Sequence, residues 1–462
     1  MTCRIGNGAG FLGDNLDAPR LLAERGELDY LTLEYLSELT LSILTRLREK
    51  DPAAGYAADL IGVLASLCPS LRDQPGLKLV TNGGGMNPPS CAAAAAAPLI
   101  AAGLGDDSIG VVTGDDLAGQ IARLQAEGCR FENLETGEPL DTSKQQVVSA
   151  NAYLGARPIA DALSQGARYV ITGRVADASL TVGPAMRELG WSWDDWNRVA
   201  AASVAGHIIE CGAQATGGLY RHWESLDLAH VGYPIAELSP DGGVVITKSP
   251  KTGGQVSRDT VIEQLLYEIG NPAHYLTPDV DVDFTTLEVN QLAADRVAVS
   301  GATGRTAPAC YKVSLAYRAG FTTSGQLLVC GRDAVAKAQA CGKMILDRVQ
   351  QAGFELDASL IECLGAGRSA PGFDSLGDVR EIMLRVSVRD RRREAVERFT
   401  KEFAPLVTSG PPGLAGYATG RSSVRPVFAY WPTLVPQQLV PARVEVRTAR
   451  EWAGVAKSGT AR

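Results

Sequence analysis

The sequence has little positive charge for its size. Its 44 Lys and Arg residues are outnumbered by 52 Asp and Glu residues, which gives a formal net charge of -8. Nucleic-acid binding needs a basic face that neutralises phosphates, and binding to an anionic membrane surface needs clustered Lys and Arg. The charge balance therefore excludes both kinds of partner and favours a small-molecule ligand.

Paired cysteine motifs, long apolar runs and a secretory leader are also missing. The nine Cys residues include no CxxC pair, so we expect reduced thiols in a cytoplasmic protein. The N-terminus lacks a charged stretch followed by an apolar one, so no secretory signal is predicted. The longest uncharged apolar run, Cys91 to Gly105, is too short to span a bilayer and predicts a buried helix.

The first half of the sequence repeats a strand–helix rhythm. Short apolar runs, partly β-branched, alternate with helical stretches, which predicts an α/β fold with a parallel sheet covered by helices. We expect this α/β domain to span residues 1–284 and to carry the active site. The expected strands are Leu28–Glu34, Leu77–Asn82, Ser108–Gly114 and Ala167–Arg174, and the expected helices are Thr40–Leu71, Ser90–Gly103, Asp116–Glu127 and Ser179–Leu189.

The second half follows a different order, and a length of 462 residues suggests more than one domain. The order ββαβα predicts a smaller α+β domain over residues 285–440, followed by a C-terminal tail, 441–462, that is disordered from Lys457. A hairpin in this domain offers an edge that a second copy can cover, so a homo-oligomer is expected. The expected elements are the strand Arg296–Ser300, a hairpin of Tyr311–Tyr317 with Gly325–Cys330, the helix Ala334–Gln351, the strand Glu381–Val388 and the helix Arg391–Phe403.

Polar residues follow each expected strand of the first domain. Because ligands of open parallel sheets bind beyond the carboxyl ends of the strands, these residues should converge on one edge and bind the substrate. Two alternatives stay open: an Asp can simply cap the next helix, and an Asn-Gly segment can be an ordinary turn. The residues are Glu34 with Glu38, then Asn82, Gly83, Gly84 and Asn87, then Asp115 and Asp116, and finally Arg174 with Asp177.

A glycine-rich segment near the start matches GxGxxG. It runs from Gly8 through Gly10 to Gly13, and Asp14 follows at once. A dinucleotide site needs a strand before the motif, a helix after it and an acidic residue about 20 positions on, so the motif alone is weak. We expect a loop that borders the substrate site through Gly8, Gly10 and Asp14, and the sequence identifies no cofactor.

The densest group of reactive residues is His207, Glu210 and Cys211. On a helix from Val204 to Cys211 these side chains share one face. His207 would act as acid or base with help from Glu210. Cys211 would be a nucleophile if His207 stabilised its thiolate. The alternative is a buried His with a satisfied hydrogen bond beside a Cys that serves as a small hydrophobe.

Metal binding is not predicted by any standard pattern. The His and Cys residues show none of the usual zinc spacings. Asp279, Asp281 and Asp283 alternate, which on a strand places them on one face. Such a run can hold a hard cation or form a solvated edge, and no metal ligand is assigned.

Several longer motifs together resemble one known family. Between Arg4 and Tyr430 the chain is similar to the acyclic terpene utilisation (AtuA-type) family. The resemblance implies a role in the breakdown of acyclic terpenoids such as citronellol and geraniol through coenzyme A thioesters, and it does not define a reaction. The motifs that carry it are Arg4–Asp14, Asn151–Gly155, Ile171–Leu180, Gly206–Gly218, Thr260–Ile269 and Tyr275–Val280.

These observations lead to one hypothesis and two alternatives. We expect an enzyme of the lyase or hydratase type that acts on a branched acyl-CoA or a related small carboxylic substrate. His207 or Asp177 would move the proton, and Arg174 would pair a substrate carboxylate bidentately. Backbone amides of Asn82–Gly85 would stabilise an enolate oxygen. The alternatives are a hydrolase or acyl transferase with Cys211 as nucleophile, and a non-catalytic subunit of an acyl-CoA-processing complex.

Arg174 and Asp177 are spaced to form an ion pair. They lie three residues apart just beyond the fourth expected strand. If Arg174 clamps a substrate, Arg174→Lys should lose most turnover, because an ammonium cannot reproduce the planar fork. On the sequence alone, the same substitution is expected to change stability by less than about 1 kcal/mol.

Overall fold

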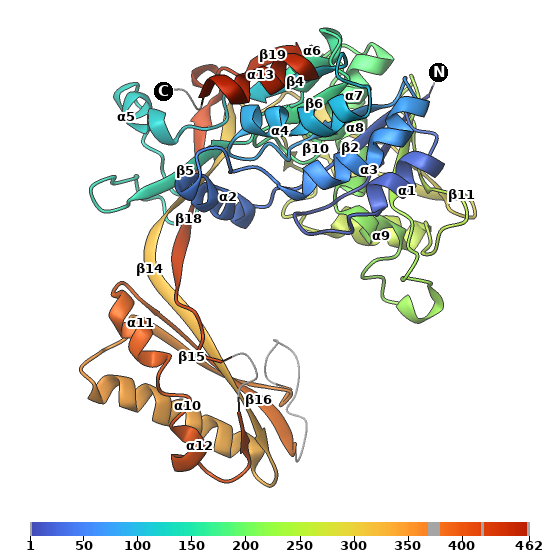
Figure 1. Cartoon of the computed structure of the whole chain (residues 1–462). Helices are drawn as coiled ribbons and strands as arrows, with labels where there is room; N and C mark the ends of the chain where they lie inside the picture. The colour runs from blue at the N-terminus through green and yellow to red at the C-terminus, as the bar shows by residue number, and fades with distance from the viewer. Residues whose placement is uncertain (1, 368–378, 417–419, 460–462) are drawn as a thin grey trace. The chain divides into compact units, whose positions relative to one another are not determined.

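The computed structural model describes residues 2–367, 379–416 and 420–459 (Figure 1). The chain forms two compact units. Unit 1 comprises Met1–Thr142, Val147–Leu315 and Trp431–Arg462, and unit 2 comprises Ser143–Gln146 and Ala316–Tyr430.

Unit 1 is built around a mixed sheet. Its central strands pair in parallel, which confirms the expected α/β class. Antiparallel strands extend both edges, so the sheet is not purely parallel. Within the described residues its order is β11 (Glu288–Ala293), β12 (Arg296–Ser300), β8 (Val244–Lys248), β7 (Pro234–Leu238), β1 (Cys3–Asn7), β2 (Tyr30–Leu33), β3 (Lys78–Thr81), β6 (Tyr169–Thr172), β4 (Ser108–Thr113) and β19 (Arg443–Thr448).

The boundary expected near Phe284 does not coincide with the division into units. β11 and β12 follow Phe284 in the chain, but they continue the sheet of unit 1. The expected C-terminal tail also belongs to this unit, because β19 pairs with β4 and is followed by α13 (Ala449–Gly459). The helix covers Lys457, where disorder was expected, and residues 460–462 lie outside the described residues.

Helices cover both faces of this sheet (Figure 1). Alternate residues of a strand point to opposite faces, so Leu31 and Leu33 of β2 share one apolar core with the first helix layer, while Tyr30 and Thr32 face the other way. The first layer contains α1 (Ala18–Arg25), α3 (Asp59–Asp73), α4 (Pro88–Ala101) and α13, and the second contains α6 (Arg157–Ser164), α7 (Ser179–Leu189) and α8 (Trp196–Glu210).

The long helix expected over Thr40–Leu71 is two helices. The first, α2 (Glu38–Lys50), starts at a capping box formed by Ser37 and Thr40. A connection that contains Pro52 and Gly55 separates it from α3, and Gly55 has a φ of 100° that a helix cannot contain. No helix within the described residues is long and apolar enough to cross a membrane.

The remaining elements of unit 1 are short. The helix expected from Asp116 to Glu127 is reduced to a 3-10 turn followed by α5. These elements are β5 (Val147–Ala152), β9 (Tyr275–Leu276), β10 (Asp281–Asp283), β13 (Thr303–Arg305), α5 (Ile121–Ala126), α9 (Arg258–Leu266), η1 (Ala118–Gln120), η2 (Gly212–Thr216), η3 (Trp223–Ser225), η4 (Phe284–Thr286) and η5 (Gln437–Leu439).

Unit 2 has an antiparallel sheet, but the hairpin expected within it is wrong. Cys310–Cys330 form one continuous strand, β14, which pairs with β16 (Glu381–Asp390). Gly320 has a φ of 99°, yet the chain continues in the strand instead of reversing. The other elements are β15 (Ala358–Leu364), β17 (Leu414–Ala415), β18 (Arg425–Pro436), α10 (Ala334–Gln351), α11 (Arg393–Phe399) and α12 (Leu406–Ser409).

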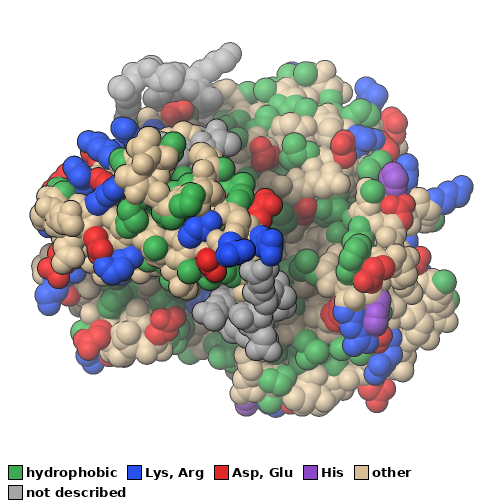
Figure 2. Space-filling view, turned by 90° about the horizontal axis from the view of Figure 1, so that it is seen from below, with side chains coloured by type: hydrophobic (Ala, Val, Ile, Leu, Met, Phe, Trp, Pro, Cys, Tyr) green, Lys and Arg blue, Asp and Glu red, His purple; other side chains and the backbone are tan. Residues whose placement is uncertain are grey.

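The helices of unit 2 carry paired charges on their exposed side. α10 and α11 pack their apolar residues against β14 and β16. Their outer faces carry i,i+4 ion pairs, such as Lys343 with Asp347 and Arg393 with Glu397. Figure 2 shows acidic and basic side chains intermingled over the part of the molecule that faces the viewer.

The expected homo-oligomer loses the hairpin edge on which it rested and stays a prediction. We still expect association, because most soluble oligomers are closed assemblies of identical chains. Light scattering at micromolar concentration should give a mass well above the 48.7 kDa of one chain. A single species at the mass of one chain would contradict this prediction.

Candidate functional site

The carboxyl ends of several strands of unit 1 border a cavity of about 530 Å³, a size suited to a small molecule. Its walls come from the loop after β1, the segments after β2 and β6, and the end of α8. The lining residues are Gly10, Phe11, Asp14, Glu34, Leu36, Ser37, Glu38, Arg174, Asp177, Glu210, Cys211, Ala213, Gln214, Gly218, Leu219, Tyr233, Tyr267 and Glu268.

Glu34 directly follows β2 and is almost fully buried. Its Oε1 accepts hydrogen bonds from the Asn82 side chain and from the Leu36 amide. Burial, together with the negative charge of Asp177, raises the pKa of Glu34 well above its ordinary value. Glu34 is therefore harder to ionise than an ordinary glutamate.

Arg174 follows β6 and is the cation at the centre of the cavity. Its guanidinium donates to the Leu36 carbonyl and to Asp177, and it lies 4.1 Å from the ring of Tyr153. Glu34 is also near, with 3.9 Å between Nη1 and Oε1. Burial raises the pKa of Asp177, and the charge of Arg174 opposes that rise.

The expected role of Arg174 as a substrate clamp stays a prediction. Each terminal nitrogen donates once inside the protein, to Leu36 and to Asp177. Nε has no partner among the described residues, so the guanidinium keeps N–H groups that a ligand can accept from. Arg174 also joins the segment after β2 to the segment after β6.

The residue that follows β4 holds the backbone of Arg174 in place. Asp115, which follows β4, accepts hydrogen bonds from the Arg174 amide at 2.8 Å and from the Asn151 side chain at 2.9 Å. Burial raises the pKa of Asp115 to about 6. The strand ends therefore meet as expected, but Asp115 positions the backbone of Arg174 and does not line the cavity.

His207 and Glu210 form a buried pair at the end of α8. His207 Nδ1 lies 3.1 Å from Glu210 Oε1, and His207 Nε2 lies 3.0 Å from the Gln264 carbonyl oxygen. A carbonyl can only accept, so Nε2 carries a hydrogen. A proton then lies between Nδ1 and Glu210, either on the imidazole or on the carboxyl group.

Burial and the contact between the two side chains act in opposite directions on the pKa of each member of this pair. Burial raises the pKa of Glu210 to about 7, and the nearby His207 opposes the rise. Burial alone would lower the pKa of His207, but the interactions with Glu210 and with the Gln264 carbonyl raise it overall. The cavity therefore has a carboxyl group that titrates near neutral pH, with His207 behind it as a positioning residue.

Cys211 lines the cavity but lacks the surroundings of a nucleophile. Burial, and then the charge of Glu210, raise the pKa of its thiol. Both nitrogens of His207 are bound elsewhere, so His207 does not stabilise a thiolate. Cys211 is therefore a protonated thiol at neutral pH.

Glu38 differs from the buried acids. The Tyr153 hydroxyl donates to its Oε1 at 2.9 Å, and Lys312 Nζ lies 3.2 Å from the same oxygen. Partial burial would raise the pKa of Glu38, but its own backbone amide, Lys312 and Tyr153 lower it overall. Glu38 is ionised at neutral pH, while Glu34 and Glu210 have raised pKa values.

The glycine-rich loop borders the cavity, as expected. It connects β1 to α1, and a Cβ on Gly10 would come within 2.7 Å of the Cys211 backbone. The Gly10 amide donates to Asp14 Oδ2 at 2.8 Å, and the Tyr233 hydroxyl donates to Asp14 Oδ1 at 2.5 Å. The loop therefore presents a carboxylate to the cavity where a dinucleotide loop would present an unpaired amide.

Several expected substrate-binding residues lie outside the cavity lining. In the Asn82–Asn87 turn, Gly84 packs so closely that a Cβ would come within 2.5 Å of the Thr172 carbonyl. The amides of Gly83, Gly85 and Asn87 donate to groups of this segment, and the turn contributes nothing to the cavity lining. The turn interpretation fits Asn82–Gly85, and the capping interpretation fits Asp116, which accepts from the Ala118 amide. The residues outside the lining are Gly8, Asn82, Gly83, Gly84, Asn87, Asp115, Asp116 and His207.

Each of the three alternating acids is engaged by protein groups, and Arg305 contacts two of them, Asp281 and Asp283. Asp279 accepts from the Ala156 amide, while Asp281 pairs with His274 and Asp283 with Arg305. Among the residues that the structure describes, no group of three or more His, Cys, Asp or Glu side chains is arranged to hold a metal ion.

Some lining residues were not singled out from the sequence. Glu38 was noted only as a neighbour of Glu34, and Glu268 lies within one of the motifs shared with the family. Glu268 has a φ of 61°, which is rare for a residue other than glycine. Gln214 lies in another of these motifs, and Tyr233 had no signal, because single polar residues in loops are common.

Three buried polar atoms of the lining residues have no hydrogen-bond partner among the described residues. They are Glu34 Oε2, Arg174 Nε and Glu210 Oε2. Buried polar atoms are nearly always hydrogen-bonded in native proteins. Their presence together at one cavity indicates a site prepared for a polar ligand.

The fold and cavity define an α/β protein with an acid-rich pocket at the carboxyl edge of its sheet. The chain belongs to the acyclic terpene utilisation family: the family model described as acyclic terpene utilisation family protein AtuA matches residues 3–446. This confirms the resemblance drawn from the motifs. Comparison with curated proteins and with solved structures gives no match.

Proposed function

We propose that this chain is an acid–base enzyme of the lyase or hydratase type that acts on a small branched acyl thioester. The observation that carries the proposal is the meeting of ionisable groups with opposite pKa shifts in one cavity. Glu210 has a pKa raised to about 7, and the pKa of Glu38 is lowered. Such pairs divide the roles of acid and base.

The free oxygen of Glu210 supports its role as the acid. Oε1 faces His207, while Oε2 has no partner among the described residues. A protonated Glu210 can donate to a departing hydroxyl group. The proton that Glu210 shares with His207 is then the one donated, and a water molecule restores it before the next turnover.

The proposed elimination removes water from a 3-hydroxyacyl thioester in one acid–base step. The Glu38 carboxylate removes the proton from the carbon next to the thioester carbonyl, and the electron pair of that bond forms the new double bond. The carbon–oxygen bond of the 3-hydroxyl group breaks, and Glu210 protonates the departing oxygen to give water. Hydration is the same sequence in reverse.

The charge of the cavity favours an uncharged acyl group over a free carboxylate. Acidic side chains outnumber the single Arg in the lining. A substrate carboxylate would meet like charges, and the charge of Arg174 is already paired with Asp177. A thioester carbonyl and a hydroxyl group carry no charge, and the family's link to acyclic terpenes favours branched chains.

A substrate screen tests this proposal. The purified chain should interconvert at least one branched 2-enoyl-CoA and the matching 3-hydroxyacyl-CoA, followed by absorbance of the conjugated thioester. Absence of both turnover and thermal stabilisation across the panel would contradict the proposal and favour a non-catalytic subunit.

Replacement of Cys211 separates this proposal from thiol catalysis. Cys211→Ser should keep turnover within about threefold, whereas loss of a true nucleophile costs several orders of magnitude. Intact-mass spectrometry after substrate addition should show no acyl adduct. An adduct that disappears in the variant would establish the hydrolase or acyl transferase alternative.

A further inference from the structure

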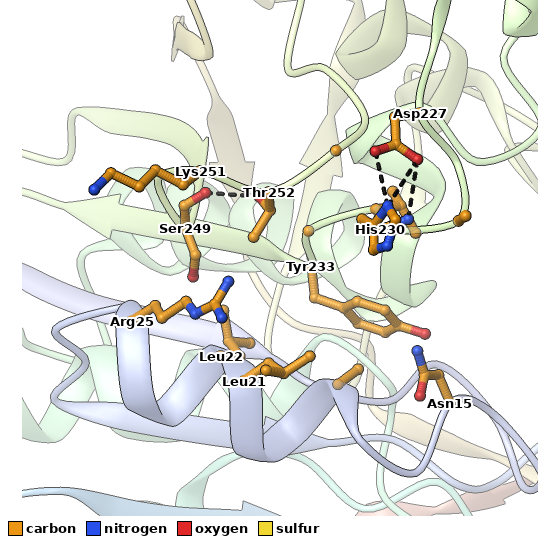
Figure 3. Close-up of a pocket in the computed structure, with 15 residues that line it drawn as sticks. Asn15, Leu21, Leu22, Arg25, Asp227, His230, Tyr233, Ser249, Lys251 and Thr252 are labelled. Atoms are coloured by element: carbon orange, nitrogen blue, oxygen red, sulfur yellow. Dashed lines mark hydrogen bonds and ion pairs between the residues drawn. The ribbon is translucent and has the colours of Figure 1, made fainter.

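A second cavity in unit 1, of about 650 Å³, has a different character (Figure 3). It lies between α1 and two loops, one before β7 and one after β8. Tyr233 lines both cavities, and Asn15 lines this one directly after Asp14 of the acidic cavity. The glycine-rich loop thus contributes to both.

Ser249 marks this second cavity as a ligand site. Its side chain lines the cavity and is 2% exposed, and its Oγ has no hydrogen-bond partner among the described residues. In Figure 3 this hydroxyl and the guanidinium of Arg25 point toward one another. A buried hydroxyl without a partner is costly unless a ligand binds it.

The turn that carries Ser249 is held by its own contacts. Thr252 Oγ1 donates to the Ser249 carbonyl at 2.7 Å, and Lys248 Nζ donates to the Thr252 carbonyl at 2.9 Å. Lys248 also pairs with Asp295 at 3.2 Å. These contacts hold the backbone of the turn in place before any ligand arrives, which lowers the cost of binding.

The charge of this cavity is basic. Arg25 and Lys251 line it, and neither has an ion-pair partner in the described part of the chain. The single carboxylate in the lining, Asp227, is paired with His230 at 2.9 Å. Two cations and a buried hydroxyl donor suit an anion with several oxygens.

We propose that this cavity binds a phosphoryl group, with Arg25 and Ser249 as its main contacts and Lys251 as an additional cation. The binding site itself stands on these residues alone. Its further use, to hold the phosphorylated adenosine of a coenzyme A thioester whose acyl group occupies the acidic cavity, rests on the proposed function. The common wall at Tyr233 and the opposite charges of the two cavities fit such a substrate.

Isothermal titration of the full chain tests the site without any turnover. The probes are inorganic phosphate, adenosine 3′,5′-bisphosphate and coenzyme A, at low and high salt. Arg25→Ala should weaken binding about tenfold, and Ser249→Ala should weaken it by a few fold. Arg20→Ala is the matched control, because Arg20 lies on the same helix but is paired with Glu24 and lines neither cavity.

The possible results distinguish binding of a phosphoryl group from binding of coenzyme A. Equal weakening by Arg20→Ala and Arg25→Ala, or no binding of any probe at about 1 mM, would overturn the phosphoryl site. Binding of phosphate without tighter binding of the bisphosphate would keep the site and remove the coenzyme A assignment. Tight binding of coenzyme A by a chain that turns over no thioester would support the site while contradicting the proposed function.

Discussion

Glu210→Gln is expected to lower kcat by about 10²–10⁴-fold, the usual contribution of a general acid. The amide keeps the size of the side chain and can still contact His207, but it cannot release a proton. In the parent, Glu210 is protonated below its pKa of about 7 and loses the proton above it. Dehydration should therefore fall as pH rises through about 7, and this limb should vanish in the variant.

The measurement is the pH profile of kcat/KM for the best thioester in the screen. Glu402→Gln is a suitable control, because Glu402 is also buried and paired, with Arg398, but belongs to unit 2. A Glu210→Gln variant that keeps the parental rate and the same limb would remove Glu210 from the proposed role.

Arg174→Met is expected to destabilise unit 1 by about 3–5 kcal/mol, the usual cost of removing one partner from a buried ion pair. The side chain is 2% exposed, and its loss leaves Asp177 and the Leu36 carbonyl without their donor. Chemical denaturation should show the difference, with Arg198→Met as control. Arg198 pairs with Asp195 on the surface of the same unit, where such a pair contributes about 0–1 kcal/mol.

The structure also changes the expectation for Arg174→Lys. An ammonium cannot reach Leu36 and Asp177 with the geometry of the planar fork, so a loss of about 1–3 kcal/mol replaces the small effect expected from the sequence. Equal stability of Arg174→Met and the parent would show that the guanidinium does not join these two segments.

The sequence predicts the candidate site only as far as it predicts where the parallel strands end. Glu34, Arg174 and Asp177 follow apolar runs that the sequence marks as parallel strands, and the sheet brings their ends together. The sequence does not show which side of a strand end faces the cavity. Asp115 therefore could not be distinguished from Glu34, although Asp115 supports the backbone of Arg174 and Glu34 lines the pocket.

The fold was harder to predict where strands are far apart in the chain. β12 was expected as a strand with its observed bounds, but its neighbour β8 lies about fifty residues earlier, and antiparallel pairing over such a distance leaves no local pattern. The expected hairpin within β14 failed for a related reason. Gly320 signals a turn locally, but the pairing of β14 with β16 keeps the chain extended.

A carbon-13 NMR titration of Glu210 tests the proposed acid most directly and needs no substrate. Glutamate labelled at the side-chain carboxyl carbon gives one signal per residue, and the signal absent from Glu210→Gln identifies this group. We predict that the Glu210 carboxyl group titrates around its raised pKa of about 7. A titration at or below the ordinary value of 4.5 would contradict the assignment of Glu210 as a proton donor at neutral pH.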